Sequence, residues 1–451
     1  MASKGLIDAP PMSRRMVRSL FKAKYIVTCN GRFDIIRDGA VVAEDGKIAY
    51  VGKEVGLGEC QRHFDLVVDE GCGIMIPGLV NCHTHAAMSL YKGVSDDVPL
   101  KEWLEGTIWP LESRVDSMSL LYGNYVAMME MLSSGTTTFA DFYFFDELIK
   151  ALKVIPMRSI ATLALMDRVP DGEVYWSRLK KIGAYVDAVG SVKDGLVGLA
   201  LGPHAIYSCS EALLLEVAKL SSGLHLPIHI HLSETKEERE LSMKEHGVSP
   251  VKYLDSLGFL SERVFAAHCV HVDDEDVGIL LDRGVSCVHN PSSNLKLGSG
   301  IMPLRGILRR GVNVCLGTDG SASSNSLNIL AEMRLAVLLQ RGISFDPTFP
   351  TAKDALLMAT RNGARALGLG DRVGSIEVGK RADLVLFDGR SPRLLPEHDI
   401  VSNVVYSSQP ADVAYTIVDG RILYDHGRFA GIDSGSVLDI FGERALKLLE
   451  G

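Results

Sequence analysis

Two histidines one residue apart, His83 and His85, close the strand-like apolar run PGLVNCHTH. Alternate residues of a strand point to the same face, so both imidazoles could bind one metal ion. An isolated pair of this kind is more often a pair of ordinary polar residues in a turn. This pair is not isolated. Histidines and a carboxylate also end later apolar runs, at His204, His231, His268, His289 and Asp319.

Two of these positions complete a donor set suited to a divalent transition metal. His231 ends the run LPIHIH, and Asp319 ends NVCLGTD. Imidazole nitrogens and a carboxylate oxygen, with one position left open to water, are typical ligands of catalytic metal sites. We predict four ligands: His83, His85, His231 and Asp319. His229, two residues before His231 on the same face, is predicted to lie deeper, as a supporting residue or part of a packed polar core.

Glu234 and His268 are the candidates for moving protons. A metal lowers the pKa of bound water, but hydrolysis also requires proton carriers that are not saturated by the metal. Glu234 comes three residues after His231, where the strand turns into a loop, so its carboxylate could reach over a bound substrate. His268 could hydrogen-bond the attacking hydroxide. The alternatives are a glutamate at a helix start and a core histidine. His271 is not predicted to be catalytic.

Eight strand-like runs alternate with helix-length amphipathic stretches between residues 77 and 369. This alternation predicts an α/β fold, a TIM (β/α)8 barrel, whose active site lies at the carboxyl ends of the strands. Residues 16–76 and 370–451 have the texture of short strands and turns. We predict that these two segments meet as one small composite β-sandwich, and that residues 1–15 form a flexible tail.

The composition is that of a folded globular protein, with 47% hydrophobic and 23% charged residues in 451. A net charge of −9, without long runs of one sign, argues against nucleic acid or an anionic membrane as a partner and favours a small molecule. No apolar run is long enough to span a bilayer. Eight cysteines without a CxxC pair predict free thiols in the cytoplasm. The basic first 24 residues leave an organelle transit peptide as the alternative.

Five motifs, PGLVNCHTH, IHLSETKEE, AHCVH, VHNPSSNLKLG and LGTDGSASSNSLN, resemble those of the metal-dependent amidohydrolase superfamily. Within it the chain resembles the 5-methylthioadenosine/S-adenosylhomocysteine deaminases from about residue 20 to about residue 430. The resemblance implies a barrel with a β-sandwich and a mononuclear site with the four ligands above. Zinc is the expected metal; iron occurs in related deaminases, and ligand spacing does not separate the two.

The resemblance also implies roles in hydrolytic deamination. Asp319 would accept a proton from the metal-activated water, and Glu234 would protonate a ring nitrogen. His268 would orient the hydroxide that attacks the purine C6, after which ammonia leaves. Related proteins assemble into dimers or tetramers, so the resemblance implies a homo-oligomer. The long connection that carries Trp103 is the best lid candidate.

Four substrate contacts follow from the same resemblance. Trp103 and Glu112, in LKEWLEGTIWPLE, match positions that pack the nucleoside and bind the ribose hydroxyls. A carboxylate that accepts from two adjacent hydroxyls suits that task. His204 matches a histidine that contacts the nucleoside, and Arg178 is a looser match to an arginine that meets the homocysteine carboxylate. The alternatives are a core tryptophan and a structural histidine.

Leu163 is a departure from the pattern, because some family members carry a second arginine at this strand end. Its loss weakens the case for S-adenosylhomocysteine and favours methylthioadenosine, 5'-deoxyadenosine or adenosine. An alternative within the superfamily is action on a free heterocycle such as guanine, 8-oxoguanine or a triazine. Trp103 and Glu112 argue against it, since a bare heterocycle has no use for a diol acceptor. His204 stands where binuclear members carry a bridging lysine.

Two readings outside this class are disfavoured. A barrel that has become a scaffold should lack ligands, whereas this chain has every expected ligand and proton carrier. A cytidine-type nucleic-acid deaminase needs HxE and PCxxC signatures and a basic groove, which this sequence does not have.

Overall fold

The computed structural model describes residues 17–58, 63–169 and 172–450. The predicted tail over residues 1–15 lies outside them. Eight parallel strands, each hydrogen-bonded to its sequence neighbours, follow one another in the order of the chain. They are β5 (Leu79–Thr84), β6 (Thr136–Asp141), β7 (Arg158–Leu165), β8 (Val197–Pro203), β9 (Ile228–Leu232), β10 (Val264–His268), β11 (Ser286–His289) and β12 (Asn313–Leu316).

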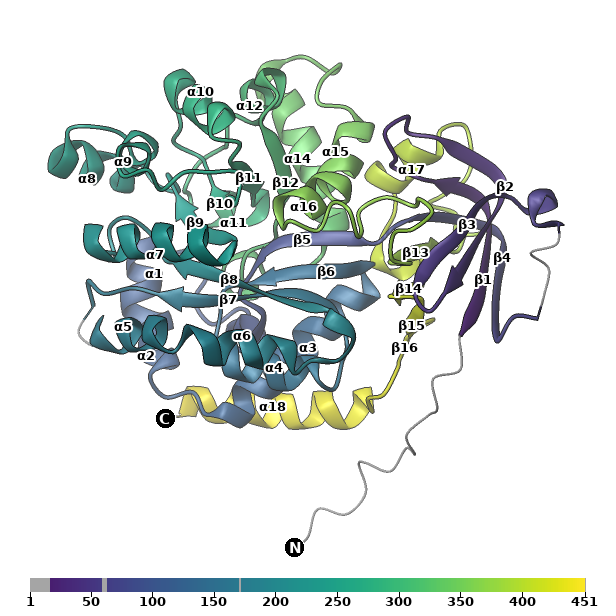
Figure 1. Cartoon of the computed structure of the whole chain (residues 1–451), viewed down its shortest axis with the longest axis horizontal. Coiled ribbons are helices and arrows are strands. Elements are labelled where there is room, and N and C mark those ends of the chain that lie inside the picture. Colours follow the sequence, from purple (N-terminus) through teal and green to yellow (C-terminus); the bar gives the residue numbers. More distant parts are fainter. Residues whose placement is uncertain (1–16, 59–62, 170–171, 451) are drawn as a thin grey trace, which may run out of the picture.

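The barrel closes where its last strand meets its first. The backbone amide of Asp319, just beyond β12, donates to the carbonyl of His83 on β5 at 2.9 Å. Helices surround this sheet, as Figure 1 shows. The predicted TIM barrel is therefore confirmed, and its strands bring the end of each apolar run to one rim.

The helices vary greatly in length. Those after the first five strands are α1 (Leu100–Trp103), α2 (Trp109–Glu112), α3 (Ser117–Ser133), α4 (Phe145–Leu152), α5 (Gly172–Lys180), α6 (Ile182–Gly190), α7 (Glu211–Leu224), α8 (Lys236–His246) and α9 (Pro250–Ser256). Those that follow are α10 (Asp274–Asp282), α11 (Pro291–Lys296), α12 (Leu304–Arg310), α13 (Ser321–Ser324), α14 (Ile329–Ser344), α15 (Ala352–Met358), α16 (Arg361–Ala366), α17 (Ile400–Tyr406) and α18 (Ser434–Glu450). No helix within the described ranges is long and apolar enough to cross a membrane.

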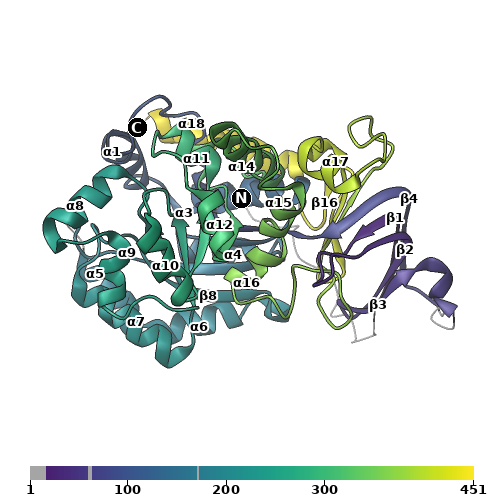
Figure 2. The same cartoon turned by 90° about the horizontal axis from the view of Figure 1, so that it is seen from above.

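A second sheet lies to one side of the barrel, as both views show (Figures 1 and 2). Its order is β16-β15-β14-β13-β4-β1-β2-β3. The strands are β1 (Arg18–Val27), β2 (Ile35–Glu44), β3 (Lys47–Lys53), β4 (Leu66–Pro77), β13 (Leu384–Phe387), β14 (Val413–Val418), β15 (Arg421–Asp425) and β16 (Arg428–Phe429). β4 pairs parallel with β1 and antiparallel with β13, so it joins the two ends of the chain. The predicted meeting of both ends in one β unit is confirmed.

The C-terminal helix α18 leaves this β unit and packs along α3 of the barrel. Its Leu448 is buried in the same apolar cluster as Trp103 and Leu111. Arg444 donates to Asp116 at 2.9 Å. The segment 370–451, which we assigned to the β unit, thus also contributes a helix to the barrel surface beside α1 and α2.

A buried ion network joins the two units. Arg158, at the start of β7 and only 1% exposed, donates through Nε and Nη2 to the two carboxylate oxygens of Asp383 at 2.7 and 2.9 Å. Its Nη2 also donates to Asp419 at 3.2 Å, and Asp419 pairs in addition with Arg381. Removing this arginine would leave carboxylates buried with one cation fewer.

Arg158→Met is expected to lower the free energy of unfolding by about 3–5 kcal/mol, because it removes the cation and leaves its carboxylate partners buried. Urea unfolding followed by circular dichroism measures the change. The control is Arg390→Met, because Arg390 is 72% exposed and pairs with Asp388 at the surface, where solvent screens the pair. Equal losses in the two variants would contradict the role assigned to Arg158.

Candidate active site

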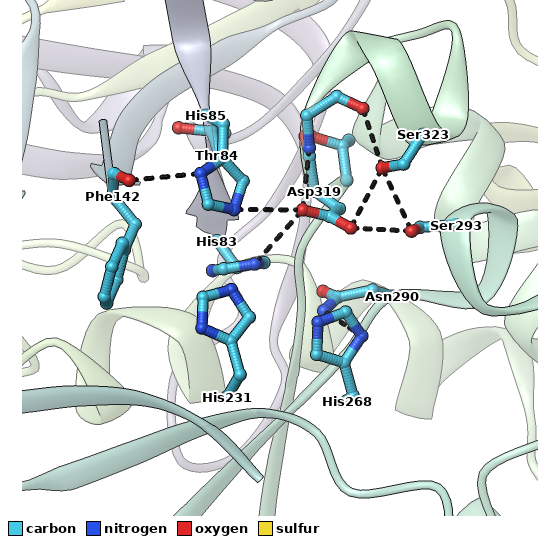
Figure 3. A network of polar contacts seen from close by, with 12 residues as sticks. His83, Thr84, His85, Phe142, His231, His268, Asn290, Ser293, Asp319 and Ser323 are labelled. Carbon is cyan, nitrogen blue, oxygen red and sulfur yellow. Dashed lines mark hydrogen bonds and ion pairs between the residues drawn. The ribbon is translucent and has the colours of Figure 1, made fainter. Parts of the chain in front are cut away.

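Five side chains converge at the carboxyl end of the barrel: His83 from β5, His85 directly after β5, His231 from β9, His268 from β10 and Asp319 after β12 (Figure 3). The potential ligand atoms of His83, His85 and Asp319 lie within 4.8 Å of one another. Those of His83, His231 and His268 do so as well. The structure therefore brings together the four predicted ligands and one predicted proton carrier.

Hydrogen bonds to backbone carbonyls orient two of the imidazoles. Nδ1 of His85 lies 3.1 Å from the carbonyl oxygen of Phe142, and Nδ1 of His231 lies 2.9 Å from that of His204. A carbonyl oxygen only accepts, so Nδ1 must carry the proton in both rings. In the neutral ring Nε2 then keeps its lone pair, and in both residues it faces the centre of the site, as a metal ligand requires.

His83 is held by a chain of side chains. Its Nδ1 lies 2.8 Å from Nε2 of His229, whose Nδ1 lies 3.0 Å from the hydroxyl of Thr162. Nε2 of His83 is buried and, among the described residues, has no hydrogen bond of good geometry. An orphaned buried nitrogen next to a carboxylate has the chemistry of a metal ligand. His229 supports His83 in this arrangement and does not itself face the site.

Asp319 completes the donor set. Its Oδ1 lies 3.2 Å from Nε2 of both His83 and His85, and its Oδ2 accepts from the hydroxyls of Ser293 and Ser323 at 2.6 and 2.9 Å. Burial alone would raise the pKa of Asp319, but the two imidazoles hold it well below its usual value. Asp319 has a φ of 63°, a strained conformation of a kind that clusters at functional sites.

Two of the predicted ligands, His83 and His231, are in the neutral form that binds metal, whereas the neighbouring carboxylate of Asp319 outweighs the effect of burial on His85 and raises its pKa. Burial lowers the pKa of His83 to about 4 and that of His231 well below its usual value. Deprotonated imidazoles and an ionised carboxylate are the states that a divalent cation needs. The residues present therefore fit a metal ion of the zinc type.

Glu234 and His268 face each other beside the ligands. Oε2 of Glu234 lies 3.7 Å from Nε2 of His268, and burial raises the pKa of Glu234. Nδ1 of His268 lies 2.8 Å from Oδ1 of Asn294, an acceptor, so Nδ1 carries the proton. The Nε2 of a neutral His268 is then free to accept a hydrogen bond from a molecule in the site.

One cavity of about 250 Å³ opens onto these groups. Every predicted site residue lines it except His83, which is fully buried beneath. The predicted substrate contacts on its wall are Trp103, Glu112, Arg178 and His204, and Leu163 lies there too. His204 is kept neutral by burial, which lowers its pKa to about 4, and its Nδ1 lies 2.9 Å from the hydroxyl of Ser208.

Trp103 and Glu112 lie on α1 and α2, which are joined by a π-helical turn at Leu104–Ile108. Residues nine apart in an uninterrupted α-helix point in opposite directions, since each residue turns the helix by about 100°. The wider π turn changes this phase, and both side chains line the cavity. The hydroxyl of Tyr143 donates to Oε1 of Glu112 at 2.6 Å.

The aromatic wall of the cavity was not predicted from the sequence. Phe142, Tyr143, Phe144 and Phe145 follow β6, and Tyr175, Tyr185 and Tyr207 come from later loops and helices. The signal for the first group was present, because the run FYFF directly follows a predicted barrel strand, where side chains face the active site.

Arg178 is held in place by a hydrogen bond and by contact with an aromatic ring. Its Nη1 donates to the carbonyl of Ala164 at 3.0 Å, and its guanidinium lies 4.8 Å from the centre of the Tyr175 ring. Two other histidines noted in the sequence do not line the cavity. His271 bonds through Nε2 to the carbonyl of Ser299 at 2.7 Å, and His289 is buried.

A barrel that gathers imidazoles and carboxylates at one rim in this way is typical of metal-dependent hydrolases. The model of the amidohydrolase family matches residues 74–423. The chain belongs to this family, and the predicted resemblance is confirmed.

Two curated relatives and one solved structure show the closeness of this similarity. The chain is 41% identical over 423 residues to the 5-methylthioadenosine/S-adenosylhomocysteine deaminase of Moorella thermoacetica, covering 94% of this chain and 97% of that protein. It is 42% identical over 414 residues to the 5'-deoxyadenosine deaminase of Methanothermobacter thermautotrophicus, covering 92% and 95%. The structure of a Xanthomonas campestris adenosine deaminase with bound zinc is 32% identical, with a TM-score of 0.92, covering 96% of this chain and 99% of that one.

Proposed function

We propose that this protein is a metal-dependent aminohydrolase that removes the C6 amino group of adenosine-type nucleosides, giving the inosine analogue and ammonia. Its substrates are 5-methylthioadenosine, S-adenosylhomocysteine, 5'-deoxyadenosine or adenosine. The observation that carries this proposal is the presence, on one cavity, of a metal donor set and a half-buried carboxylate, Glu112, of the kind that accepts from a diol. The names of the relatives support the same substrate class.

His83, His85, His231 and Asp319 would hold one divalent ion, which we propose to be zinc. The zinc in the Xanthomonas relative supports this choice, and iron is the alternative. A divalent ion bound there lowers the pKa of a coordinated water towards neutrality and so supplies a nucleophile at neutral pH.

Two carboxyl groups of the protein, those of Asp319 and Glu234, transfer the protons. Asp319 accepts a proton at Oδ1, because this oxygen lies beside Nε2 of His83 and His85, whereas Oδ2 points away to two serine hydroxyls. Glu234 donates a proton to a ring nitrogen of the purine, and burial raises its pKa, which favours the protonated form that this step needs. His268 orients the attacking water through Nε2.

Recognition of the nucleoside rests on the cavity wall. Glu112 accepts from the ribose hydroxyls, with Tyr143 fixing one of its oxygens. Trp103 packs against the nucleoside, and His204, kept neutral, contacts it. Free guanine, 8-oxoguanine or a triazine has no diol to donate to Glu112, so its binding would lack the hydrogen bonds that a ribose makes there.

The reaction itself can be tested by isotope labelling. The purified, metal-loaded protein is incubated with 5'-deoxyadenosine in water enriched in the heavy oxygen isotope, and the product is examined by mass spectrometry. The proposal requires one heavy oxygen at C6 and one equivalent of ammonia. Release of free adenine, or a product without the label, would reject hydrolytic deamination.

Leu163 supports a preference for small or apolar 5'-substituents. It lies near the end of β7 and lines the cavity, as do Ala164, Met166 and Arg178. A leucine cannot pair with a carboxylate. We therefore propose that methylthioadenosine, 5'-deoxyadenosine and adenosine are better substrates than S-adenosylhomocysteine. Among the described residues that line the cavity, Arg178 is the one permanently charged cation available to its amino-acid tail.

Leu163→Arg is expected to raise kcat/KM for S-adenosylhomocysteine about 5-fold to 50-fold relative to that for methylthioadenosine, because it adds a charged donor for the tail carboxylate. Steady-state kinetics with both nucleosides measures the ratio. Methylthioadenosine serves as the internal control, since it shares the purine and ribose but has no carboxylate. An unchanged ratio would show that this strand end does not face the 5'-substituent.

We further propose that the protein acts in the cytoplasm as a homo-oligomer, a dimer or a tetramer. The described cysteines are free, and all of them except Cys72 are buried, which fits a reducing compartment.

A further inference from the structure

We propose that Glu238 is a positioning residue for deamination: its buried carboxylate fixes the backbone turn that presents Glu234 to the substrate. The inference rests on the proposed role of Glu234. Glu238 lies in the first turn of α8 and is 4% exposed. The function proposed above gives it no part, although it is one of the most deeply buried carboxylates near the site.

Both oxygens of Glu238 bind the turn that carries Glu234. Oε1 accepts from the backbone amide of Ser233 at 3.0 Å, and Oε2 accepts from the amide of Glu234 at 2.8 Å. The carbonyl of Ser233 accepts in turn from the amides of Val270 and His271 at 3.0 and 2.8 Å. The turn is therefore held from two sides, by the helix that follows it and by the loop after β10.

This arrangement differs from an ordinary helix cap. Thr235 is the N-cap of α8, and its side chain accepts from the amide of Glu238. A glutamate at this third position usually reaches back to the amide of the capping residue itself. Here the side chain of Glu238 reaches past Thr235 to the amides of Ser233 and Glu234. Its hydrogen bonds therefore hold the turn of the site and leave the amide of the capping residue unbound by Glu238.

The turn needs such support because it is strained. Ser233 has a φ of 51°, a left-handed conformation that is costly for a residue with a side chain. The carboxylate of Glu234 must also stand 3.7 Å from His268, beside Asp319. Burial raises the pKa of Glu238 to about 7, and the two backbone donors oppose that rise by stabilising the carboxylate. The two hydrogen bonds to the turn therefore explain why a carboxylate is found in this buried position.

Glu238→Gln tests the inference, because an amide keeps one acceptor oxygen and cannot accept from the second backbone N–H. The kcat for the best nucleoside substrate is expected to fall about 10-fold to 100-fold, since small displacements of a reacting group have effects of this size. KM and the zinc content should change less than about twofold, because neither the cavity wall nor the ligands are touched. The control is Glu237→Gln, an exposed neighbour on the same helix, which should match the wild type.

A double-mutant cycle separates positioning from a general structural role. In a Glu234→Gln background the added Glu238→Gln change should lower kcat by less than about twofold, because the group that it positions is already gone. An equal fall in both backgrounds would overturn the inference. So would an unchanged kcat in Glu238→Gln. Failure of the proposed function itself would appear earlier, as wild-type protein that does not deaminate any nucleoside.

Hydrogen exchange gives a readout that does not depend on activity. Exchange of the Ser233 and Glu234 amides, followed by mass spectrometry, should be faster in Glu238→Gln than in Glu237→Gln. If Glu238→Gln is poorly folded, Glu238→Asp provides the same comparison, since a shorter carboxylate cannot span both amides. Unchanged protection of these two amides in a folded variant would refute the proposal that Glu238 holds them.

Discussion

Glu234→Gln is expected to lower kcat about 100-fold to 10,000-fold, the usual contribution of a general acid or base. The amide keeps the shape of the side chain but cannot deliver a proton to the purine ring. Its place beside His268, in a buried setting that raises its pKa, is what suits the carboxyl group to this role. Ammonia release under saturating nucleoside measures the effect.

Metal content and substrate binding show whether that loss is chemical. Glu234 is not among the proposed ligands, so the zinc content of the variant should equal that of the wild type. Glu240→Gln is the matched control, because Glu240 lies on α8 with a side chain that is 65% exposed. A variant that loses its zinc, or that keeps near wild-type kcat, would remove Glu234 from the proton-transfer step.

His231→Ala is expected to weaken zinc binding by more than about 100-fold and to abolish ammonia release. Replacement of a residue that supports a ligand typically costs 10-fold to 100-fold in metal affinity, and loss of the ligand itself should cost more. His229 offers a matched comparison, because it lies on the same strand and face as His231. It hydrogen-bonds the ring of His83 instead of facing the site.

The comparison of these two histidines is decisive for the ligand set. Competition with a chromogenic chelator measures the zinc affinity of each variant. His229→Ala should lose about 10-fold to 100-fold in affinity, through the freed ring of His83. The reverse order, with His229→Ala losing zinc more completely than His231→Ala, would mean that the two residues have been assigned the wrong way round.

The site was the most predictable part of the molecule, for a physical reason. In a barrel of parallel strands, residues far apart in sequence meet if each one ends a strand. The positions of His83, His231 and Asp319 at strand ends were therefore enough to predict that they converge. Position along β9 also separated His229 from His231, because the two share a face and His229, two residues earlier, was predicted to lie deeper in the barrel.

The features that were not predicted depend on contacts between distant segments. The network of Arg158 with Asp383 and Asp419 joins residues more than 200 positions apart, and no local pattern indicates it. The same holds for α18, which was predicted as part of a β unit but whose Leu448 packs beside Trp103. The phase between Trp103 and Glu112 depends on a π turn that is not recognisable from an amphipathic pattern.

Strained backbone conformations are a further feature that was not predicted from the sequence. His268 and Asp319 adopt φ values of 75° and 63°, although neither is a glycine. Sequence reasoning favours relaxed conformations, whereas these two positions are held by their surroundings, Asp319 through its carboxylate and His268 through Asn294. Such departures from local preference are expected where function sets the geometry.

The most direct test of the proposed function is a comparison of initial rates of ammonia release by zinc-loaded protein. The substrates are methylthioadenosine, 5'-deoxyadenosine, adenosine, S-adenosylhomocysteine, guanine and 8-oxoguanine, at equal concentration. The proposal predicts turnover of the adenosine compounds, with S-adenosylhomocysteine the slowest of them, and no turnover of the free bases. Turnover of guanine or 8-oxoguanine with no reaction of any nucleoside would contradict it, and with it the roles given to Glu112 and Trp103.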